Sequence, residues 1–296
     1  MNFTTWGHYL IRILNSKDIP QILEISKDIW DGTDYIPGLI SQWIEAPNTQ
    51  MVGIFSPNSP EHLLGFMRMN WNNPTSVWLE GGRIRASHQK SGLGKILLEF
   101  VLNKCDKEGV KIAQYDTSSR NFGSIALARK YGFVEKTRMR ALYIENPNLE
   151  KLIKLPENLQ YLTSSNAFEL LQTIENGPNA ELNLGWAYIP FTEEVIIKNT
   201  SRWIRNNEAI TLIYSNKDRI LNREFPDSEG LWLIVYGKVD GIQKLIVQAI
   251  SNLYSPQIKH FSVFCPECAA EKLEELGFGY YENEKTSVIL FEKIFD

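Results

Sequence analysis

In the first half of the chain, the spacing of hydrophobic residues alternates between that of strands and that of helices. Short apolar runs bounded by Gly, Pro and Asn predict strands, and apolar residues three and four positions apart predict amphipathic helices. The predicted strands are 9–14, 51–55, 63–69, 77–86, 111–117 and 134–144, and the predicted helices are 18–30, 39–45, 94–105 and 121–130. Because strands alternate with helices, we expect an α/β domain whose central mixed sheet is flanked by helices.

The second half of the chain repeats this pattern more weakly. Residues 145–156 are rich in Pro and Asn and are typical of a linker. Beyond them we predict strands at 159–163, 231–235 and 261–264, and helices at 167–175, 244–251 and 269–276. The helix end Leu276-Gly277-Phe278 repeats Tyr131-Gly132-Phe133 of the first half. We therefore predict tandem copies of one fold, a first domain at 1–145 and an altered second domain at 146–296.

The clearest motif, Gln89-Lys90-Ser91-Gly92-Leu93-Gly94-Lys95, lies between the predicted strand 77–86 and the predicted helix 94–105. Its glycines let the backbone approach a ligand closely. The N–H groups and the dipole at the start of the helix favour a pyrophosphate, and the lysines add positive charge. A plain turn is the alternative. The spacing differs from a Walker A loop and from a three-glycine dinucleotide fingerprint.

Composition excludes several classes of function. The chain has 31 Lys and Arg against 35 Asp and Glu, a net charge of -4, so it lacks the basic surface of a nucleic-acid-binding protein. No apolar run is long enough to span a membrane, and no secretion signal is present at the start. Three cysteines are too few for a disulfide framework, and Cys265-Pro266-Glu267-Cys268 lacks a second ligand pair for zinc. We expect a cytoplasmic monomer or homodimer without a metal.

The motif Gln89-x-x-Gly92-x-Gly94 resembles the acetyl-CoA loop of the GNAT N-acetyltransferase superfamily. Asn121, followed by Ala126 and by Gly132-Phe133, is similar to a block that follows this loop in the family. The resemblance covers residues 9–143, and the layout with a degenerate second half is also similar to histidine N-acetyltransferase-like proteins. It implies tandem GNAT-like domains. The first would be catalytic, and the second would cover the acceptor site or mediate association.

The resemblance also implies which residues bind acetyl-CoA, the cosubstrate. The backbone of Ile84 and Ala86 would hold the pantetheine arm, and Asn121 would contact the arm near the thiol. The pyrophosphate would lie against the N–H groups of Gln89, Lys90, Ser91, Gly92, Leu93, Gly94 and Lys95.

Transfer of an acetyl group to a primary amine needs a base, and two acids are placed for that role. Glu80 lies on the strand before the loop and Asp116 on the next strand; an ion pair and a turn cap are their alternative roles. Strand alternation places Glu80 on the face of Ile84 and Ala86, opposite Arg83. At the position of the family's tyrosine acid this chain has Ala128, so Tyr131 or Tyr115 would donate the proton, or the thiolate would leave unaided.

For the acceptor, the sequence favours a small amino-acid-like amine. Arg83 could hold a substrate carboxylate. Asp31, Asp34 and Tyr35, in the loop between the first two helices, could contact a cationic amine. The alternatives are a peptide or protein N-terminus as acceptor, a CoA-binding regulatory module without chemistry, and a nucleotide-binding protein that uses the glycine loop for ATP.

Overall fold

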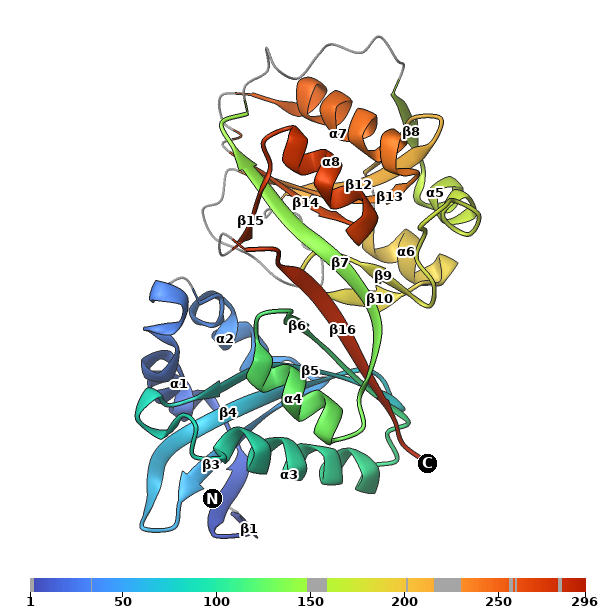
Figure 1. Ribbon diagram of the computed structural model, residues 1–296. Helices are drawn as coiled ribbons and strands as arrows, with labels where there is room; N and C mark the ends of the chain where they lie inside the picture. The colour runs from blue at the N-terminus through green and yellow to red at the C-terminus, as the bar shows by residue number, and fades with distance from the viewer. Residues whose placement is uncertain are drawn as a thin grey trace. The chain divides into compact units, whose positions relative to one another are not determined.

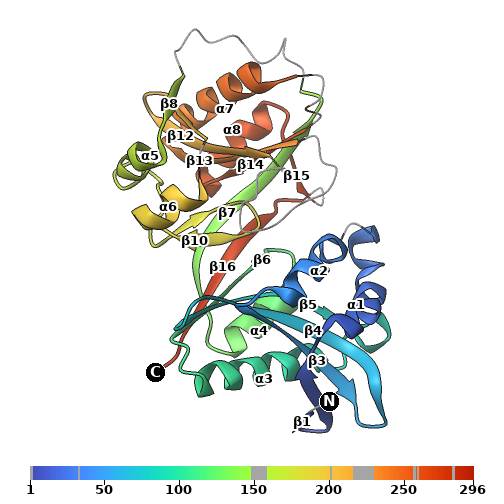
Figure 2. The ribbon, with the colours of Figure 1, turned by 180° about the vertical axis from the view of Figure 1, so that it is seen from behind.

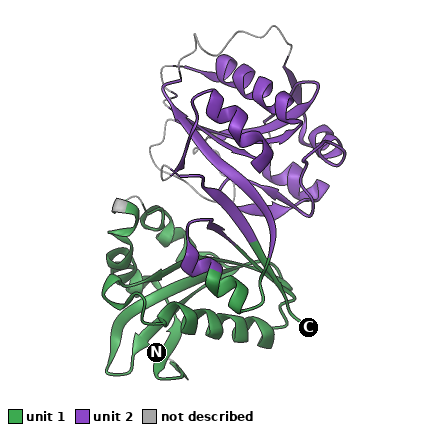
Figure 3. Ribbon diagram, in the orientation of Figure 1, with its two compact units in different colours: residues 1–115, 126–134, 291–296 green, residues 116–125, 135–290 purple. Residues whose placement is uncertain are grey.

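The computed structural model describes residues 3–32, 34–147, 159–200, 202–215, 230–255, 258, 260–281 and 284–296. Its contacts divide the chain into two compact units (Figure 3). Unit 1 consists of Met1–Tyr115, Ala126–Val134 and Phe291–Asp296, and unit 2 of Asp116–Ile125 and Glu135–Leu290. Most of the predicted linker 145–156 lies outside the described residues, and the domain boundary at 145 stays a prediction.

Unit 1 is built on a mixed sheet in the order β1-β2-β3-β4-β5-β6 (Figure 1). Neighbours are antiparallel from β1 to β5, whereas β5 and β6 are parallel. The strands are β1 Thr4–Trp6, β2 Tyr9–Ile13, β3 Thr49–Ser56, β4 Ser59–Asn73, β5 Ser76–Ile84 and β6 Ile112–Ser118. The helices are η1 Ser16–Asp18, α1 Ile19–Ser26, η2 Ile29–Gly32, α2 Ile36–Glu45, η3 Ala86–His88, α3 Leu93–Lys107 and α4 Phe122–Lys130. Strands β6, β7 (Val134–Glu145) and β16 (Ser287–Ile294), and helix α4, contribute residues to both units.

Helices α1 and α2 pack on the sheet of unit 1 through a buried cluster. Ile22 of α1 and Trp43 of α2 lie with Phe55 and Phe66 of the strands, and all four are at most 2% exposed. The predicted helix 18–30 was too long. Trp30 (φ 48°) and Gly32 (φ 85°) have left-handed backbone angles, which an α-helix does not accommodate, so α1 ends at Ser26 and the short η2 follows.

The strands of unit 2 are paired in the order β7-β14-β13-β12-β11-β8, with β15 also paired to β7 (Figure 2). Only β13 and β14 are parallel in this set. The strands are β8 Gln160–Leu162, β11 Trp203–Arg205, β12 Ala209–Ser215, β13 Gly230–Gly237, β14 His260–Cys265 and β15 Gly279–Tyr280, and β9 Glu181–Asn183 and β10 Tyr188–Pro190 form a separate hairpin. The helices are α5 Ser164–Leu171, α6 Glu193–Asn199, α7 Val239–Leu253, η4 Glu267–Ala269 and α8 Ala270–Glu275.

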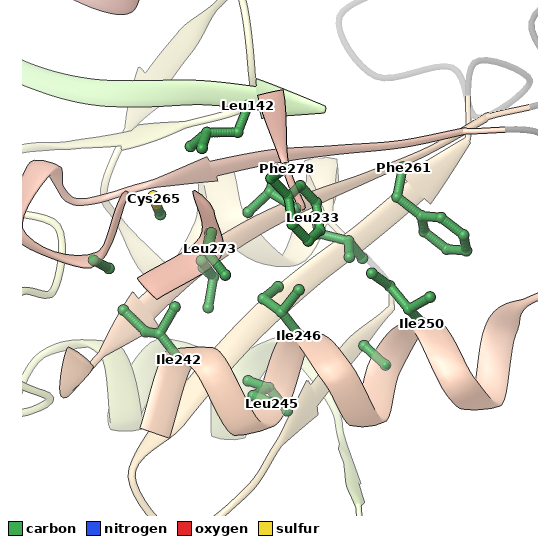
Figure 4. Packing of buried hydrophobic residues seen from close by; sticks show 14 of the residues in the cluster. Leu142, Leu233, Ile242, Leu245, Ile246, Ile250, Phe261, Cys265, Leu273 and Phe278 are labelled. Atoms are coloured by element: carbon green, nitrogen blue, oxygen red, sulfur yellow. The ribbon is translucent and has the colours of Figure 1, made fainter. Parts of the chain in front are cut away.

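The core of unit 2 lies between α7, α8 and the sheet (Figure 4). Ile242, Ile246 and Ile250 are four residues apart on α7, and they point toward Leu233 of β13 and its neighbours. Residues at this spacing lie on one face of a helix, and α7 extends the predicted helix 244–251 at both ends. The predicted fold class is confirmed, since each unit has a mixed sheet flanked by helices. No helix in the described ranges is long and apolar enough to cross a membrane.

Candidate active site

The segment between β5 and α3 leads into a turn in which the backbone N–H groups of residues 90–95 donate to no described residue. Its N-cap is Gly92, with φ 87°, and Lys90 is also left-handed at φ 61°. Within the described residues, no N–H group from 90 to 95 donates a hydrogen bond, whereas the Ile96 N–H donates to the Gly92 carbonyl at 3.1 Å. Unused amides and the positive end of the α3 dipole therefore meet at one place, which suits a diphosphate.

The glycines of this turn leave room for a ligand. A Cβ built on Gly92 has no atom within 4 Å, and one built on Gly94 meets only Cγ1 of Ile84, at 3.9 Å. Gln89 does not have the expected role of offering its N–H to the pyrophosphate. Its N–H donates to the Ala86 carbonyl and its side-chain Nε2 to the Ile84 carbonyl, both at 3.3 Å. Gln89 therefore braces the turn, and the set of unused amides begins at Lys90.

Strands β5 and β6 separate just before this turn. They pair only at Ser76↔Ile112, Val77↔Ala113 and Trp78↔Gln114, although β5 continues to Ile84. The edge of β5 beyond Trp78 is where an extended ligand arm would lie beside the strand. Ala86 is not on that edge, contrary to the prediction of a strand over 77–86. It lies in η3, where its carbonyl accepts the Gln89 N–H.

A bulge in β5 corrects the predicted arrangement of acidic and basic side chains. Gly81 has φ 65°, and the register with β4 shifts between Arg68↔Glu80 and Phe66↔Arg83. Two residues of β5 thus oppose one residue of β4. Cross-strand partners share a face, and so do alternate residues of β4, so Glu80 and Arg83 lie on the same face. The prediction that Glu80 lies opposite Arg83 was therefore wrong.

Glu80 lies in a buried ion pair on this face. The Arg68 guanidinium donates to its carboxylate, and the two side chains are 9% and 5% exposed. Arg68 also lies over the ring of Trp43, at 4.5 Å from the ring centroid. A Cβ at Gly81 would come within 2.9 Å of the same Trp43, so the bulge allows the close packing that positions this pair.

Arg83 forms a second ion pair, which changes the role predicted for it. Its Nε and Nη2 donate to Asp34 at 3.0 and 2.9 Å, and its Nη1 donates to the Gly82 carbonyl at 3.1 Å. The guanidinium lies 4.7 Å from the ring centroid of Trp30 and 5.5 Å from that of Tyr35. Burial alone would lower its pKa, but the hydrogen bonds that it donates to Asp34 raise the pKa overall. Arg83 is thus engaged by Asp34 and does not present an open fork to a substrate carboxylate.

The other residues predicted around the acceptor are placed as follows. Tyr35 packs between Trp30 and Trp43, with ring centroids 6.0 and 5.9 Å away. The backbone of Asp31 lies in η2, and its side chain is outside the described part of the chain. Trp30 and Tyr35 thus form an aromatic wall beside the Arg83–Asp34 pair.

Two predicted residues, Asp116 and Asn121, belong to unit 2, whereas Glu80 and the glycine turn belong to unit 1. Asp116 is half-buried on β6. The Asn121 side chain accepts the Ser124 N–H at 3.1 Å and so caps helix α4. Their predicted roles at the thioester stay predictions.

Tyr131 was predicted as the proton donor to the thiolate, but its hydroxyl donates a hydrogen bond to Glu99 of α3. Burial, together with this carboxylate, raises its pKa. Ala128 is fully buried. The geometry makes Tyr131 a link between α3 and the end of α4 and argues against the acid role. Tyr115 packs on Phe133 and Phe291 at 5.1 and 5.7 Å.

The corresponding turn of unit 2, between β13 and α7, is closed by the chain itself. The Lys238 N–H donates to the Glu208 carbonyl at 3.0 Å. A Cβ at Gly241 would come within 2.5 Å of the Glu208 Cβ, and one at Gly237 within 2.4 Å of the Glu208 oxygen. The Glu208 turn thus occupies the space where the first unit is open.

Two of the three cysteines, Cys105 of unit 1 and Cys265 of unit 2, are buried. Burial raises the pKa of Cys105 to about 12. Burial also raises the pKa of Cys265, and Cys268 is exposed. Among the described residues, no group of three or more His, Cys, Asp or Glu side chains is placed to hold a metal ion.

Residues 19–133 match the profile of the acetyltransferase (GNAT) family. The structure is similar to a putative acetyltransferase from Thermoplasma acidophilum, with 13% identity and a TM-score of 0.61, over 96% of this chain and 99% of that one. It is also similar to a GCN5-related N-acetyltransferase from Sphaerobacter thermophilus, with 10% identity and a TM-score of 0.61, over 98% of this chain and 97% of that one. A third similar structure is a putative acetyltransferase from Pyrococcus horikoshii, with 14% identity and a TM-score of 0.56, over 99% of this chain and 92% of that one. No curated protein sequence matches.

These identities are low, so the likeness to the solved structures is one of fold, and it runs over nearly the full length of the chain. The family match covers α1 to the end of α4, which includes the turn with unused amides and the β5 bulge. The match to the GNAT acetyltransferase family thus lies in residues 19–133, and over the rest of the chain the likeness to acetyltransferases is one of fold.

Proposed function

We propose that the protein transfers an acetyl group from acetyl-CoA to a primary amine, by direct attack of the amine on the thioester. The observation that carries this proposal is the row of unused N–H groups at residues 90–95, open at Gly92 and Gly94. These amides would hold the pyrophosphate of CoA. The unpaired edge of β5 beyond Trp78 would guide the pantetheine arm toward Glu80.

An amine that enters as the ammonium must lose one proton before it attacks, and its nitrogen loses a second proton as the amide forms. A free α-amino group has a pKa near about 7.7–8.0, so modest help is enough. Glu80 would take the proton directly or through one water, and the ion pair with Arg68 fixes the orientation of its carboxylate. The nitrogen lone pair then forms the C–N bond, the electron pair of the breaking C–S bond leaves with sulfur, and the nitrogen releases its second proton to solvent.

The leaving thiolate needs a proton, and the geometry does not assign one donor. Tyr131 is bound to Glu99. A thiol is a weak enough base, with a pKa near about 8.5, to leave as the thiolate and gain a proton from solvent. We therefore propose a mechanism without a dedicated acid.

The acceptor is a primary amine, for which a small molecule is our first choice and a peptide or protein N-terminus the second. The three arginines on β2, β4 and β5 and Arg85, which follows β5, are all paired with carboxylates; the pairs are Arg12–Asp18, Arg68–Glu80, Arg83–Asp34 and Arg85–Glu24. Recognition of a substrate carboxylate by Arg83 would require Asp34 to leave. We therefore base acceptor recognition on the amine and on the aromatic wall of Trp30 and Tyr35.

A panel of primary amines, amino acids and short peptides, assayed for CoA release with acetyl-CoA, tests the proposal. Glu80→Gln is expected to lower turnover at least tenfold at neutral pH and to keep CoA affinity. Asp18→Asn is the matched control, because it disturbs an equally buried ion pair away from the turn. An equal loss in both variants, or full turnover in Glu80→Gln, contradicts the role of Glu80.

Calorimetry with CoA separates the alternatives. Absence of CoA binding in the intact protein refutes the proposal. Tight CoA binding without turnover over the whole panel favours a regulatory module, which the buried Ala128 and the engaged Tyr131 would suit. Competition by ATP as strong as by CoA itself would favour a nucleotide site.

A further inference from the structure

Unit 2 contains a cavity of about 520 Å³ where its two parallel strands separate. Strands β13 and β14 pair from Gly230↔His260 to Ile234↔Phe264. Tyr236, beyond the last pair on β13, and residues 266–268, after β14, line the cavity. The remaining wall comes from β7, from the segment after α5 and from the β9–β10 hairpin. This volume is typical of a site for a small molecule.

The cavity is not a second CoA site. A diphosphate would need the amides at the start of α7, and the Glu208 turn already occupies that space. The strand separation has therefore been kept in unit 2 without the diphosphate turn, which leaves a pocket for a ligand without phosphate groups.

Tyr236 provides a buried donor to this cavity. Its side chain is 3% exposed, and its hydroxyl oxygen accepts the Asn183 N–H at 3.1 Å. Within the described residues, the hydroxyl proton has no acceptor. Its neighbour Tyr188, by contrast, donates to the Val288 carbonyl at 3.2 Å. A buried O–H without an acceptor is costly, so a ligand acceptor atom at this point would be stabilising.

Charges of both signs line the same cavity. Arg138 uses Nε and Nη2 to bind Glu135 at 2.8 and 3.0 Å, and its Nη1 donates to no described residue. Glu267 accepts Arg140 at 2.8 Å and the Ser287 hydroxyl at 3.3 Å on Oε1, while its Oε2 accepts from no described residue. The cavity thus offers two unused donors, the Tyr236 hydroxyl and Nη1 of Arg138, and one unused acceptor, Oε2 of Glu267.

The geometry points to an α-amino acid zwitterion as the ligand of this cavity. Its carboxylate would accept from the Tyr236 hydroxyl and from Nη1 of Arg138, and its ammonium would donate to Oε2 of Glu267. The apolar wall includes Met139, Leu171 and Ile174 and would face the side chain. This site is separate from the turn at residues 90–95 and does not depend on the proposed acetyl transfer.

Thermal shift and calorimetry of the full chain with each of the twenty common amino acids test this inference. At least one amino acid is expected to bind, and Tyr236→Phe and Arg138→Gln are each expected to weaken it about tenfold. Tyr280→Phe is the matched control, since Tyr280 is another buried tyrosine of unit 2, bound to Glu274 and outside the cavity. The control should bind like the unmodified protein.

Two comparisons decide the chemistry and the place of the site. The amide and the N-acetyl derivative of the bound amino acid each lack one charge, so both are expected to bind at least tenfold more weakly. Gly94→Asp, placed at the turn in unit 1, should leave amino-acid binding unchanged. Failure of all twenty amino acids to bind, equal binding of the derivatives, binding that survives both cavity variants, or its loss in Gly94→Asp would overturn the inference.

Discussion

Substitutions at Gly94 separate ligand binding from stability. Gly94 lies in the first turn of α3, and an added Cβ meets only the Ile84 methylene, at 3.9 Å. Alanine therefore fits without a clash, and removing glycine from a helix stabilises it by about 0.5–1 kcal/mol. Aspartate also fits, and its charge near the helix N-terminus contributes about 0.3–1 kcal/mol. Neither variant should unfold more easily than the unmodified protein.

CoA binding should distinguish the two variants strongly. A carboxylate about 5 Å from a phosphate, at an effective dielectric constant of about 20, costs about 3 kcal/mol for each unit of charge. We expect Gly94→Asp to bind CoA at least about 100-fold more weakly and Gly94→Ala to bind it within about threefold of the unmodified protein. The defect should shrink as salt is added, because salt screens exposed charges.

Calorimetry with CoA at low and high salt, beside thermal unfolding, measures both quantities. The thermal midpoint reports whether either variant is misfolded. Equal CoA affinity in the aspartate and alanine variants would refute the diphosphate site at this turn. An aspartate variant that loses both CoA binding and thermal stability would show that the turn is required for folding, and the electrostatic argument would then be wrong.

Three further predictions follow from the same contacts. Tyr131→Phe should keep turnover within about twofold of the unmodified protein, because the Tyr131 hydroxyl donates its hydrogen bond to Glu99. A tenfold loss of turnover in a CoA-release assay would instead support Tyr131 as the proton donor. Burial raises the pKa of Asp18, but hydrogen bonds from Arg12 and from the Asn15 N–H lower it overall. The stability this group contributes is therefore present above its unfolded pKa of about 3.9 and is lost as pH falls through the lower folded value. Denaturant unfolding at a series of pH values should show that Asp18→Asn weakens the dependence of the free energy of unfolding on pH in that window. Gly241→Ala should destabilise the protein by about 1–3 kcal/mol in denaturant unfolding, since its Cβ would meet Glu208, and an unchanged midpoint would show that this turn is loosely packed.

The sequence predicted the elements that have strong periodicity. Within residues 9–145 every predicted strand and helix is present, with ends that differ by a few residues, as α2 shows by starting at Ile36 rather than 39. No prediction covered β9, β10 and β11, whose three residues each carry little alternation, or the longer β12. The role of the C-terminal strand β16 was also not predictable. Its residues from Phe291 onward belong to unit 1, where Glu292 accepts a hydrogen bond from Gln114 at 2.9 Å.

The candidate site was predictable to the extent that it is local in sequence. The turn at residues 89–95 was identified from its own glycines and from its place before a helix; the N–H groups of residues 90–95 donate to no described residue, whereas that of Gln89 donates to Ala86. The ion partners were not predictable, because Arg68 is twelve residues from Glu80 and Asp34 is 49 residues from Arg83. Pairs of this kind depend on which strand lies beside which helix, and no local pattern records that.

The error over Glu80 and Arg83 shows how one residue changes the chemistry of a face. Alternation along β5 would place a lone carboxylate opposite a lone guanidinium, and a free arginine on the acceptor side invites a substrate carboxylate. The left-handed Gly81 shifts the register by one residue and brings both groups to the side of Trp43. On that side each finds a partner of opposite charge, and the arginine is no longer free. Glycine pairs inside a strand pattern, such as Gly81-Gly82 here, are therefore a signal to suspend alternation beyond them, and the acceptor must be sought without a guanidinium anchor.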